Sequence, residues 1–595
     1  MNPEKRACPN CKQDFTIESE DFGYYQKMRV PSPTFCPDCR LQRRLAQRNE
    51  RTLHHRKCDA PGHAENIISV YAPNKNLVVY DQDYWWSDNW DAAEYGQEYD
   101  FSKPFFEQYR ELMARTPLIA LFDSKSVDSQ YCNITVGHKN CYLVSAGWDN
   151  EDSMYSNRIS YCKNAVDCYV CHKLEYAYEN VNCKDSYQLF YSRNSESCNN
   201  SWFLYDCRGC SDCICSTNLR NKQYYIFNRP HTKEEYQRKT AELNLGDRST
   251  LEMLRAKLHE LYSSSVHRYA NIYRSVDVVG DNIEDSKNCH NCFDLPGDAE
   301  NCKYCNWGTF GLKDSYDTGP GTGGKSELTY EGVSIGVNNA DCAFGTIVWY
   351  SNDLRYGFNC HNCSHVFGCV SLRNKQYCIL NKQYTKEEYE SLLPRVMEHM
   401  NSTPYMDKQG IIYKFGEYFP VEISPFAYND TVAQEYFPLS GETARAKGYS
   451  WSEKKEGSHA TTLSADELPG NISGVGDEVL NETIECAHKG ECAHQCPGAY
   501  RITPGELAFY RKFNIPLPQM CFNCRHYARL EQRNPMKLWD RQCSCLAAGL
   551  KNPSYHNKSE HFHGDKPCPN AFRTPFAPER PEIVYCENCY NHEIA

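Results

Sequence analysis

A cysteine-rich module occurs twice in this chain, once near each end. A constant offset of 485 residues aligns residues 15–58 with residues 500–543 without a gap. The alignment matches the Cys-x2-Cys pairs that begin at Cys36 and Cys521, and the Gln-Arg-Asn sequences that begin at Gln47 and Gln532. A match this continuous indicates that one folding unit has been duplicated.

Each copy carries two short cysteine pairs, and their eight members are Cys8, Cys11, Cys36, Cys39, Cys492, Cys496, Cys521 and Cys524. Four thiolates delivered as two pairs suit tetrahedral zinc, because each pair can bind one edge of the tetrahedron. The second pair of each copy opens a segment rich in helix formers. Two ligands are therefore expected in a first helical turn, where the helix dipole favours thiolate. The sequence predicts a treble-clef zinc module at each end.

These residues resemble the family of the probable zinc-ribbon (treble-clef) domain. The pattern that carries the resemblance consists of Cys8, Cys11, Phe15, Glu20, Asp21, Tyr25, Pro33, Cys36, Cys39 and Arg40. The resemblance covers the module alone in each copy and implies bound zinc. As a whole, the chain is similar to large Cys-rich bacterial zinc-binding proteins of unassigned function, which implies no particular activity.

A second site is predicted beyond the first in the C-terminal copy. Its candidate ligands are either Cys543 or Cys545, together with Cys568, Cys586 and Cys589. The corresponding part of the N-terminal copy offers Cys58, His63 and Asp81, which leaves open a weak Cys/His/Asp site. Because closed four-ligand sites are structural, we expect about three structural zinc ions.

Disulfides in a secreted protein are the alternative use of these cysteines. The chain begins with a polar segment that has no apolar signal region, and no stretch approaches the length of a membrane span. An odd total of 35 cysteines, grouped in short pairs, also suits metal binding and buried thiols better. We therefore expect a cytoplasmic protein that does not enter a membrane.

The charge distribution points to a possible nucleic-acid partner. The net charge of −12 argues against a protein that coats nucleic acid uniformly. Basic residues nevertheless cluster after the second cysteine pair of each module, and the candidates for contact with phosphate in RNA or DNA are Arg40, Arg44, Arg48, Arg529 and Arg533. An ordinary solvated helix face is the alternative interpretation.

The middle of the chain contains a second duplication. Residues 207–236 recur at 360–389 with an offset of 153, and each copy ends in a Thr-x-x-Glu capping box, at Thr232 and at Thr385. Each copy ends an array within the region of roughly 125–390. Short Tyr-, Asn- and Cys-rich segments, such as 140–144 and 167–171, recur within each array, which favours short strands stacked as a parallel β-solenoid. Most cysteines there are expected to pack inside it. Zinc binding by Cys289, Cys292, Cys302 and Cys305 is left open.

The predicted fold is therefore mainly β and multidomain, with central β-solenoid-like repeats flanked by small α+β treble-clef modules. The expected parts are a zinc module at 1–60, an aromatic-rich connector with a degenerate second zinc site at 61–124, a first array at 125–230, a helical spacer at 231–270, a second array at 271–384, a helix at 385–400, a partly ordered linker at 401–485 and a double zinc module at 486–595.

One motif suggests an enzyme. Residues 319–326 read Gly-Pro-Gly-Thr-Gly-Gly-Lys-Ser and satisfy the phosphate-binding P-loop pattern. The polar segment before them and the glycines after them do not predict the buried strand and the helix that such a loop needs. We therefore predict a zinc-stabilised scaffold that binds nucleic acid or a protein partner, without assigned catalytic residues. The alternatives are a solenoid enzyme acting on a polymer or nucleotide, with this loop as a weak candidate site, and thiol redox chemistry.

Overall fold

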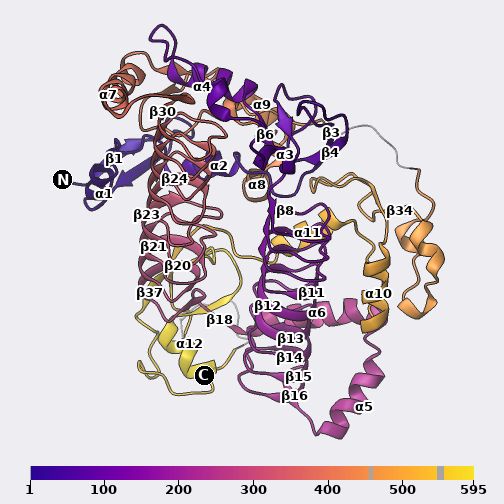
Figure 1. Cartoon of the computed structure of the whole chain (residues 1–595). Helices are drawn as coiled ribbons and strands as arrows, with labels where there is room; N and C mark the ends of the chain where they lie inside the picture. Colours follow the sequence, from indigo (N-terminus) through magenta and orange to yellow (C-terminus); the bar gives the residue numbers. More distant parts are fainter. Residues whose placement is uncertain (1, 454–459, 546–554, 595) are drawn as a thin grey trace. The chain divides into compact units, whose positions relative to one another are not determined.

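The fold is mainly β, with several sheets and short helices, in a computed structural model that describes residues 2–453, 460–545 and 555–594 (Figure 1). The chain forms two compact units, each assembled from segments distant in sequence. Unit 1 contains the described parts of 1–122, 270–453 and 536–538. Unit 2 contains those of 123–269, 454–535 and 539–595. Each cysteine module thus shares a unit with the predicted array that is farther from it in sequence.

The main sheet of unit 2 is built from parallel strands in nearly sequential order. Among the described residues it has 11 strands, from β7 (Asp123–Ser124) to β17 (Arg229–Pro230), and only the last pair is antiparallel. Asn133 in β8 (Asn133–Val136) pairs with Ser145 in β9 (Ser145–Trp148), and Ser145 pairs with Asn157 in β10 (Asn157–Ser160). The same advance of 12 residues is repeated from one strand to the next. Hydrogen bonding between strands that are close in sequence therefore builds the sheet, with β10 pairing with β12 past the short strand β11 (Lys163–Val166).

Buried asparagines satisfy the backbone where this chain turns. Asn180 Nδ2 donates to the carbonyl of Leu189 at 2.7 Å, and Asn180 Oδ1 accepts from the N–H of Ser192 at 2.9 Å. Asn339 makes the same two contacts in unit 1. A buried backbone polar group without a partner is costly, so these amides allow the turns to be buried. Left-handed residues recur along both main sheets, inside the strands as well as between them, and many are Asn or Asp, which tolerate that conformation better than most residues.

The main sheet of unit 1 follows the same plan. It has 13 strands in the described chain, from β19 (Ile272–Tyr273) to β31 (Lys382–Gln383), and only β30 (Gln376–Ile379) and β31 pair antiparallel. Each main sheet is followed by a helix with the predicted capping box. These helices are α5 (Lys233–Leu243), capped by Thr232, and α7 (Lys386–Ser402), capped by Thr385. The segment predicted as a helical spacer at 231–270 also contains a second helix, α6 (Arg248–Ser264).

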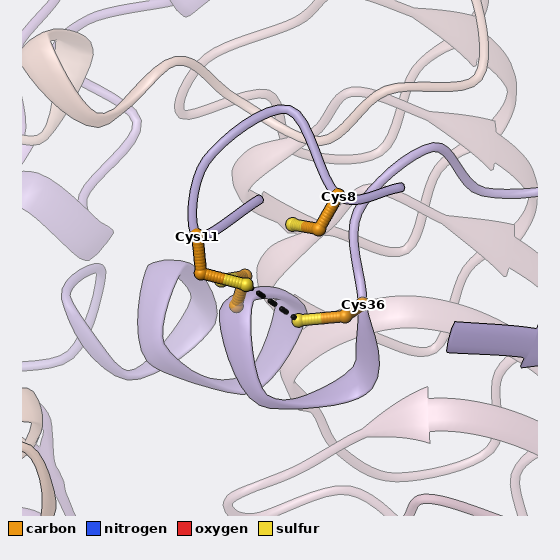
Figure 2. Close-up of side chains that lie close together, drawn as sticks. Cys8, Cys11 and Cys36 are labelled. Atoms are coloured by element: carbon orange, nitrogen blue, oxygen red, sulfur yellow. Dashed lines mark hydrogen bonds between the residues drawn. The ribbon is translucent and has the colours of Figure 1, made fainter. Parts of the chain in front are cut away.

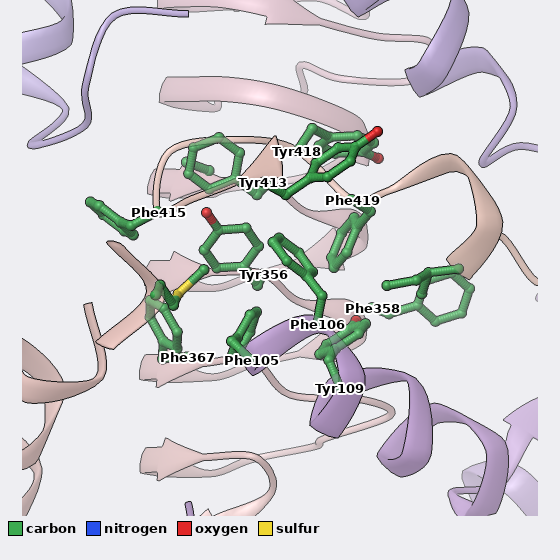
Figure 3. Packing of buried hydrophobic residues seen from close by; sticks show 14 of the residues in the cluster. Phe105, Phe106, Tyr109, Tyr356, Phe358, Phe367, Tyr413, Phe415, Tyr418 and Phe419 are labelled. Atoms are coloured by element: carbon green, nitrogen blue, oxygen red, sulfur yellow. The ribbon is translucent and has the colours of Figure 1, made fainter. Parts of the chain in front are cut away.

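Aromatic packing forms the core of unit 1 (Figure 3). Helix α4 (Phe105–Arg115) lies in the predicted connector, and its Phe105 ring packs 5.3 Å from that of Phe367 in β29 (Ser364–Phe367). Tyr413 and Phe419 are also buried in this core, although they belong to the segment predicted as a linker. Residues 454–459 of that predicted linker lie outside the described residues. The described residues around Tyr413 and Phe419 therefore pack into the core of unit 1.

The cysteine modules combine a hairpin with two helices. In the N-terminal module these are β1 (Glu4–Ala7), β2 (Asp14–Ile17), α1 (Asp21–Lys27) and α2 (Pro37–Leu45). In the C-terminal module they are β34 (Ile484–Glu485), β35 (Ala499–Tyr500), α10 (Pro504–Phe513) and α11 (Phe522–Leu530). The last segment adds β36 (Trp539–Gln542), β37 (Ala571–Thr574), β38 (Ile583–Tyr585) and α12 (Glu587–Ile594). Within the described residues, no helix has both the length and the apolar character needed to cross a membrane.

Candidate metal centres

The four predicted cysteines of the N-terminal module come together (Figure 2). The sulfurs of Cys8, Cys11, Cys36 and Cys39 lie within 4.8 Å of one another, and Cys11 Sγ is 3.6 Å from Cys36 Sγ. Cys8 and Cys11 occupy the turn between β1 and β2. Cys36 is the N-cap of α2, and Cys39 lies in its first turn, so the helix dipole favours both thiolates. Hydrogen bonds from Cys36 and Cys39 hold the pKa of Cys8 well below its usual range. The geometry suits a closed four-thiolate metal site.

The C-terminal module forms a similar group, with one member that differs from the prediction. Its four close sulfurs are those of Cys486, Cys496, Cys521 and Cys524. The sequence prediction had Cys492 in the place of Cys486. Cys486 directly follows β34, as Cys8 directly follows β1, so the two occupy the same position in their hairpins. The gapless alignment missed Cys486 because the turn of the C-terminal hairpin is longer. A search for a cysteine directly after the first strand would have found it.

The second predicted site of the C-terminal copy is also assembled. Cys543, Cys568, Cys586 and Cys589 are buried, and their sulfurs lie within 4.8 Å of one another. The structure therefore selects Cys543 for this group, while Cys545 lies beside it with His561 and His563. The hydrogen bond from Cys543 lowers the pKa of the Cys586 thiol to about 4. A thiolate is the form that binds zinc, and Cys586 is the member of this group that is held in that form.

The degenerate counterpart in the N-terminal copy brings its three residues together. Cys58 Sγ donates to Asp81 Oδ2 at 3.2 Å, and His63 Nδ1 lies 3.1 Å from the same oxygen. This set contains one thiol where the C-terminal copy has four. It is a poorer donor set for zinc than the four-cysteine group.

The thiols of the array cysteines lie close to backbone carbonyl groups. Cys289 pairs with Cys302 across β21 (Lys287–Leu295) and β22 (Glu300–Lys303). Their thiols lie 3.5 Å from the carbonyl of Ala299 and 3.6 Å from that of Leu312. In unit 2, burial raises the pKa of the Cys162 thiol to about 12, so that it stays protonated. These contacts fit a packing role, and zinc binding by Cys289, Cys292, Cys302 and Cys305 stays a prediction.

The arginines predicted to contact phosphate are placed against buried acids. Arg40 and Arg44 both pair with Asp317, at 2.8 and 3.1 Å. Arg529 pairs with Asp167 at 2.8 Å, and both side chains are fully buried. Arg48 is likewise buried and pairs with Glu50 at 2.5 Å, while the guanidinium of Arg533 lies 5.4 Å from the centre of the Tyr169 ring. A phosphate-binding role for these arginines stays a prediction, which the burial of Arg40, Arg44, Arg48 and Arg529 does not support. Sequence reasoning missed the two aspartates, since nothing in their local pattern marks them as ion-pair partners.

The P-loop-like segment joins two strands. It leads from β23 (Lys313–Thr318) into β24 (Glu327–Ile335), so a strand follows the glycines where a phosphate-binding loop requires a helix. The hydroxyl of Ser326 is buried and donates to the carbonyl of Gly336 at 2.6 Å. The strand before the loop was not expected from its polar sequence, whereas the strand in place of a helix after the loop agrees with the sequence analysis.

The fold and the donor groups together define a mainly β protein with thiolate-rich candidate metal centres near both ends. A comparison with protein-family models and a comparison with curated proteins found no match to this chain. The resemblance to the zinc-ribbon family therefore rests on the cysteine groups themselves.

Proposed function

We propose that the protein is a zinc-stabilised scaffold that binds a protein partner. In this proposal the end modules are treble-clef zinc ribbons, and the two long parallel sheets are β-solenoid arrays that provide the binding surface. Zinc is the metal that suits four thiolates at tetrahedral spacing, and closed four-thiolate sites have no open position for chemistry. A cytoplasmic location fits because a reducing compartment keeps the thiols available.

One relationship carries the zinc-stabilised part of the proposal. In both units, a helix that begins at two candidate metal-binding cysteines also places two arginines against one buried aspartate of the array. Cys524 and Arg529 lie on α11, and Arg529 meets Asp167 beside β12 (Tyr169–Tyr178). Cys39 and Arg44 lie on α2, and Arg44 meets Asp317 in β23. A metal that fixes the start of the helix thereby fixes the arginines in the array. This is a structural use of metal.

The charges favour a protein partner over nucleic acid. Arg44 and Arg529, which follow the cysteines on α2 and α11, form buried ion pairs, and the net charge of the chain is −12. A nucleic-acid site needs exposed cations to replace counterions on the phosphates. The array of unit 2 instead exposes aromatic residues at the ends of neighbouring strands. Trp148, the last residue of β9, is 41% exposed, and Tyr161, directly after β10, is 53% exposed. Exposed aromatics are common anchors at protein interfaces.

The test compares partner binding with nucleic-acid binding. The intact protein would be used to capture partners from the cells that produce it. Three forms would be compared: wild type, the W148A/Y161A double variant and the control Y350A, which removes an equally exposed tyrosine of unit 1. We expect a specific protein to be lost only from the double variant. Fluorescence anisotropy with labelled single-stranded RNA and duplex DNA at low and high salt provides the second arm. Tight binding to either nucleic acid that weakens steeply with salt would contradict the proposed protein partner and indicate a nucleic-acid partner instead.

A further inference from the structure

We propose that each C-terminal cysteine group is the inner half of a binuclear zinc centre, in which one thiolate bridges two ions. The bridging residues are Cys524 in the first centre and Cys589 in the second. The inference rests on the zinc binding proposed above, but it concerns a second ion at each centre, bound by histidines that the sequence analysis did not assign to a metal.

At the first centre, Cys524 belongs to two donor groups. The inner group is Cys486, Cys496, Cys521 and Cys524, and the outer group is His488, Cys492, His494 and Cys524. In each group the ligand atoms lie within 4.8 Å of one another. Cys524 Sγ is 3.8 Å from Cys486 Sγ on the inner side and 3.6 Å from Cys492 Sγ on the outer side. One sulfur therefore faces both groups.

The second centre repeats the arrangement with Cys589. Its inner group is Cys543, Cys568, Cys586 and Cys589, and its outer group is Cys545, His561, His563 and Cys589. Cys589 Sγ is 3.7 Å from Cys568 Sγ and 3.4 Å from His563 Nε2. Cys545 Sγ is 3.2 Å from His561 Nδ1. Both centres thus offer five thiolates and two imidazoles, and in both the bridge is the second cysteine of a Cys-x2-Cys pair.

The outer histidines of the second centre are oriented as metal ligands usually are. His561 presents Nδ1 to Cys545, and its Nε2 lies 2.9 Å from the buried Glu593 carboxylate. His563 presents Nε2 to Cys589, and its Nδ1 lies 2.6 Å from the carbonyl of Lys566. A ligating histidine typically donates its other N–H to such an acceptor, which fixes the tautomer and the ring. Each ring therefore keeps one nitrogen for the ion.

The outer histidines of the first centre have nitrogens that need a partner. Within the described residues, Nδ1 of His488 and Nδ1 of His494 are buried and make no hydrogen bond. A buried polar atom left unpaired is costly, and a zinc ion would satisfy both nitrogens. On the other side of the His494 ring, Nε2 lies 3.9 Å from the Glu531 carboxylate. Binding would release the proton of each cysteine and leave both imidazoles neutral.

The lengthened hairpin turns supply the outer donors at both centres. His488, Cys492 and His494 lie between β34 and β35, and Cys545, His561 and His563 lie between β36 and β37. The corresponding N-terminal turn, between β1 and β2, is shorter, and there the sulfur of Cys39 accepts from Asn10 Nδ2 at 3.2 Å. Cys39 is the counterpart of Cys524. We therefore expect a single ion at the N-terminal group, which gives the chain an internal control.

The test counts metal ions in the full-length protein by elemental mass spectrometry, relative to wild type. The C524S and C589S variants should each lose two zinc ions, whereas the matched C39S variant should lose one. H488A and H561A, which leave the four inner thiolates intact, should each lose one ion and keep the wild-type circular dichroism spectrum. In protein loaded with ¹¹³Cd, NMR should show pairs of coupled resonances, because two nuclei that share a sulfur are coupled through it.

The proposal is overturned if folded H488A and H561A keep every ion, or if C524S loses only one. A bound ion at each four-cysteine group without an outer ion would leave the zinc-stabilised scaffold standing and remove the bridge alone. Should the serine variants fail to fold, the histidine variants and the ¹¹³Cd coupling still decide the question.

Discussion

Arg529 donates from Nη1 to Oδ1 of Asp167 at 2.8 Å, and neither side chain is exposed to solvent. Arg44 and Asp317 form the same buried pair in the other unit, at 3.1 Å. Each aspartate also receives a second arginine from the same helix, Arg525 in unit 2 and Arg40 in unit 1. The duplication seen in the sequence is therefore also a duplicated contact between a cysteine module and a parallel sheet.

Neutralising the aspartate should destabilise unit 2 strongly. The D167N variant keeps the shape and tolerates the left-handed backbone of this position, but it leaves two buried guanidinium groups without their shared carboxylate. Removing one partner of a buried ion pair typically costs about 3–5 kcal/mol of unfolding free energy. Urea denaturation followed by circular dichroism would measure this loss. D317N should behave alike in unit 1.

The control for this experiment is D285N, which breaks the exposed pair between Asp285 and Arg274. Exposed ion pairs contribute less than about 1 kcal/mol, so the curve should barely move. Equal losses in D167N and D285N would contradict a special role for the buried pair.

Much of the local structure could be predicted, because it depends on residues close together in sequence. The capping boxes at Thr232 and Thr385 and the cysteine pairs at the start of α2 and α11 are set by spacing alone. Cys486 could not be found by a gapless alignment, since a turn can lengthen without moving the ligand that follows its first strand. Local patterns cannot predict long-range partners either. Asp167 lies more than three hundred residues from Arg529, and its own neighbours give no sign of the pair.

Removing the metal should loosen the modules more than the arrays. Chelation leaves the four thiols of each group without the ion that holds them together, whereas the parallel sheets keep their own hydrogen bonds. Hydrogen exchange followed by mass spectrometry should show faster exchange in α2 and α11 after chelation. Amides of β14 (Asn199–Tyr205), which pair with both neighbouring strands, should keep their protection. Uniform loss of protection would mean that the arrays also depend on metal.

A buried histidine should make unit 2 sensitive to mild acid. Burial lowers the pKa of His138 to about 4, and its Nε2 lies 3.0 Å from Asn150 Nδ2. The pKa is lower in the folded than in the unfolded protein, so the stabilising contribution is present above pH 6.5 and is lost as the pH falls toward 4. Within this pH window, the unfolding free energy falls by about 1.4 kcal/mol for each unit by which the pH falls. Because metal release in acid affects both proteins, the quantity to measure is the difference in unfolding free energy between wild type and H138N, from pH 7 to pH 4. Parallel profiles would contradict the prediction.

Alkylation should separate the two classes of cysteine. The thiolate is the reactive form, and burial raises the pKa of Cys183 in the array to about 12, whereas the hydrogen bond from Cys543 lowers that of Cys586 to about 4. With metal bound, coordination should protect Cys586, so iodoacetamide should label neither residue quickly. After chelation, peptide mapping by mass spectrometry should find Cys586 alkylated and Cys183 still protected at the same time point. Addition of zinc before the reagent should restore the protection of Cys586, because only a ligand is shielded by the ion. Equally fast reaction of Cys183 and Cys586 after chelation would contradict the prediction. It would mean that metal loss exposes the array thiols, and that packing cysteines and ligating cysteines do not differ in reactivity.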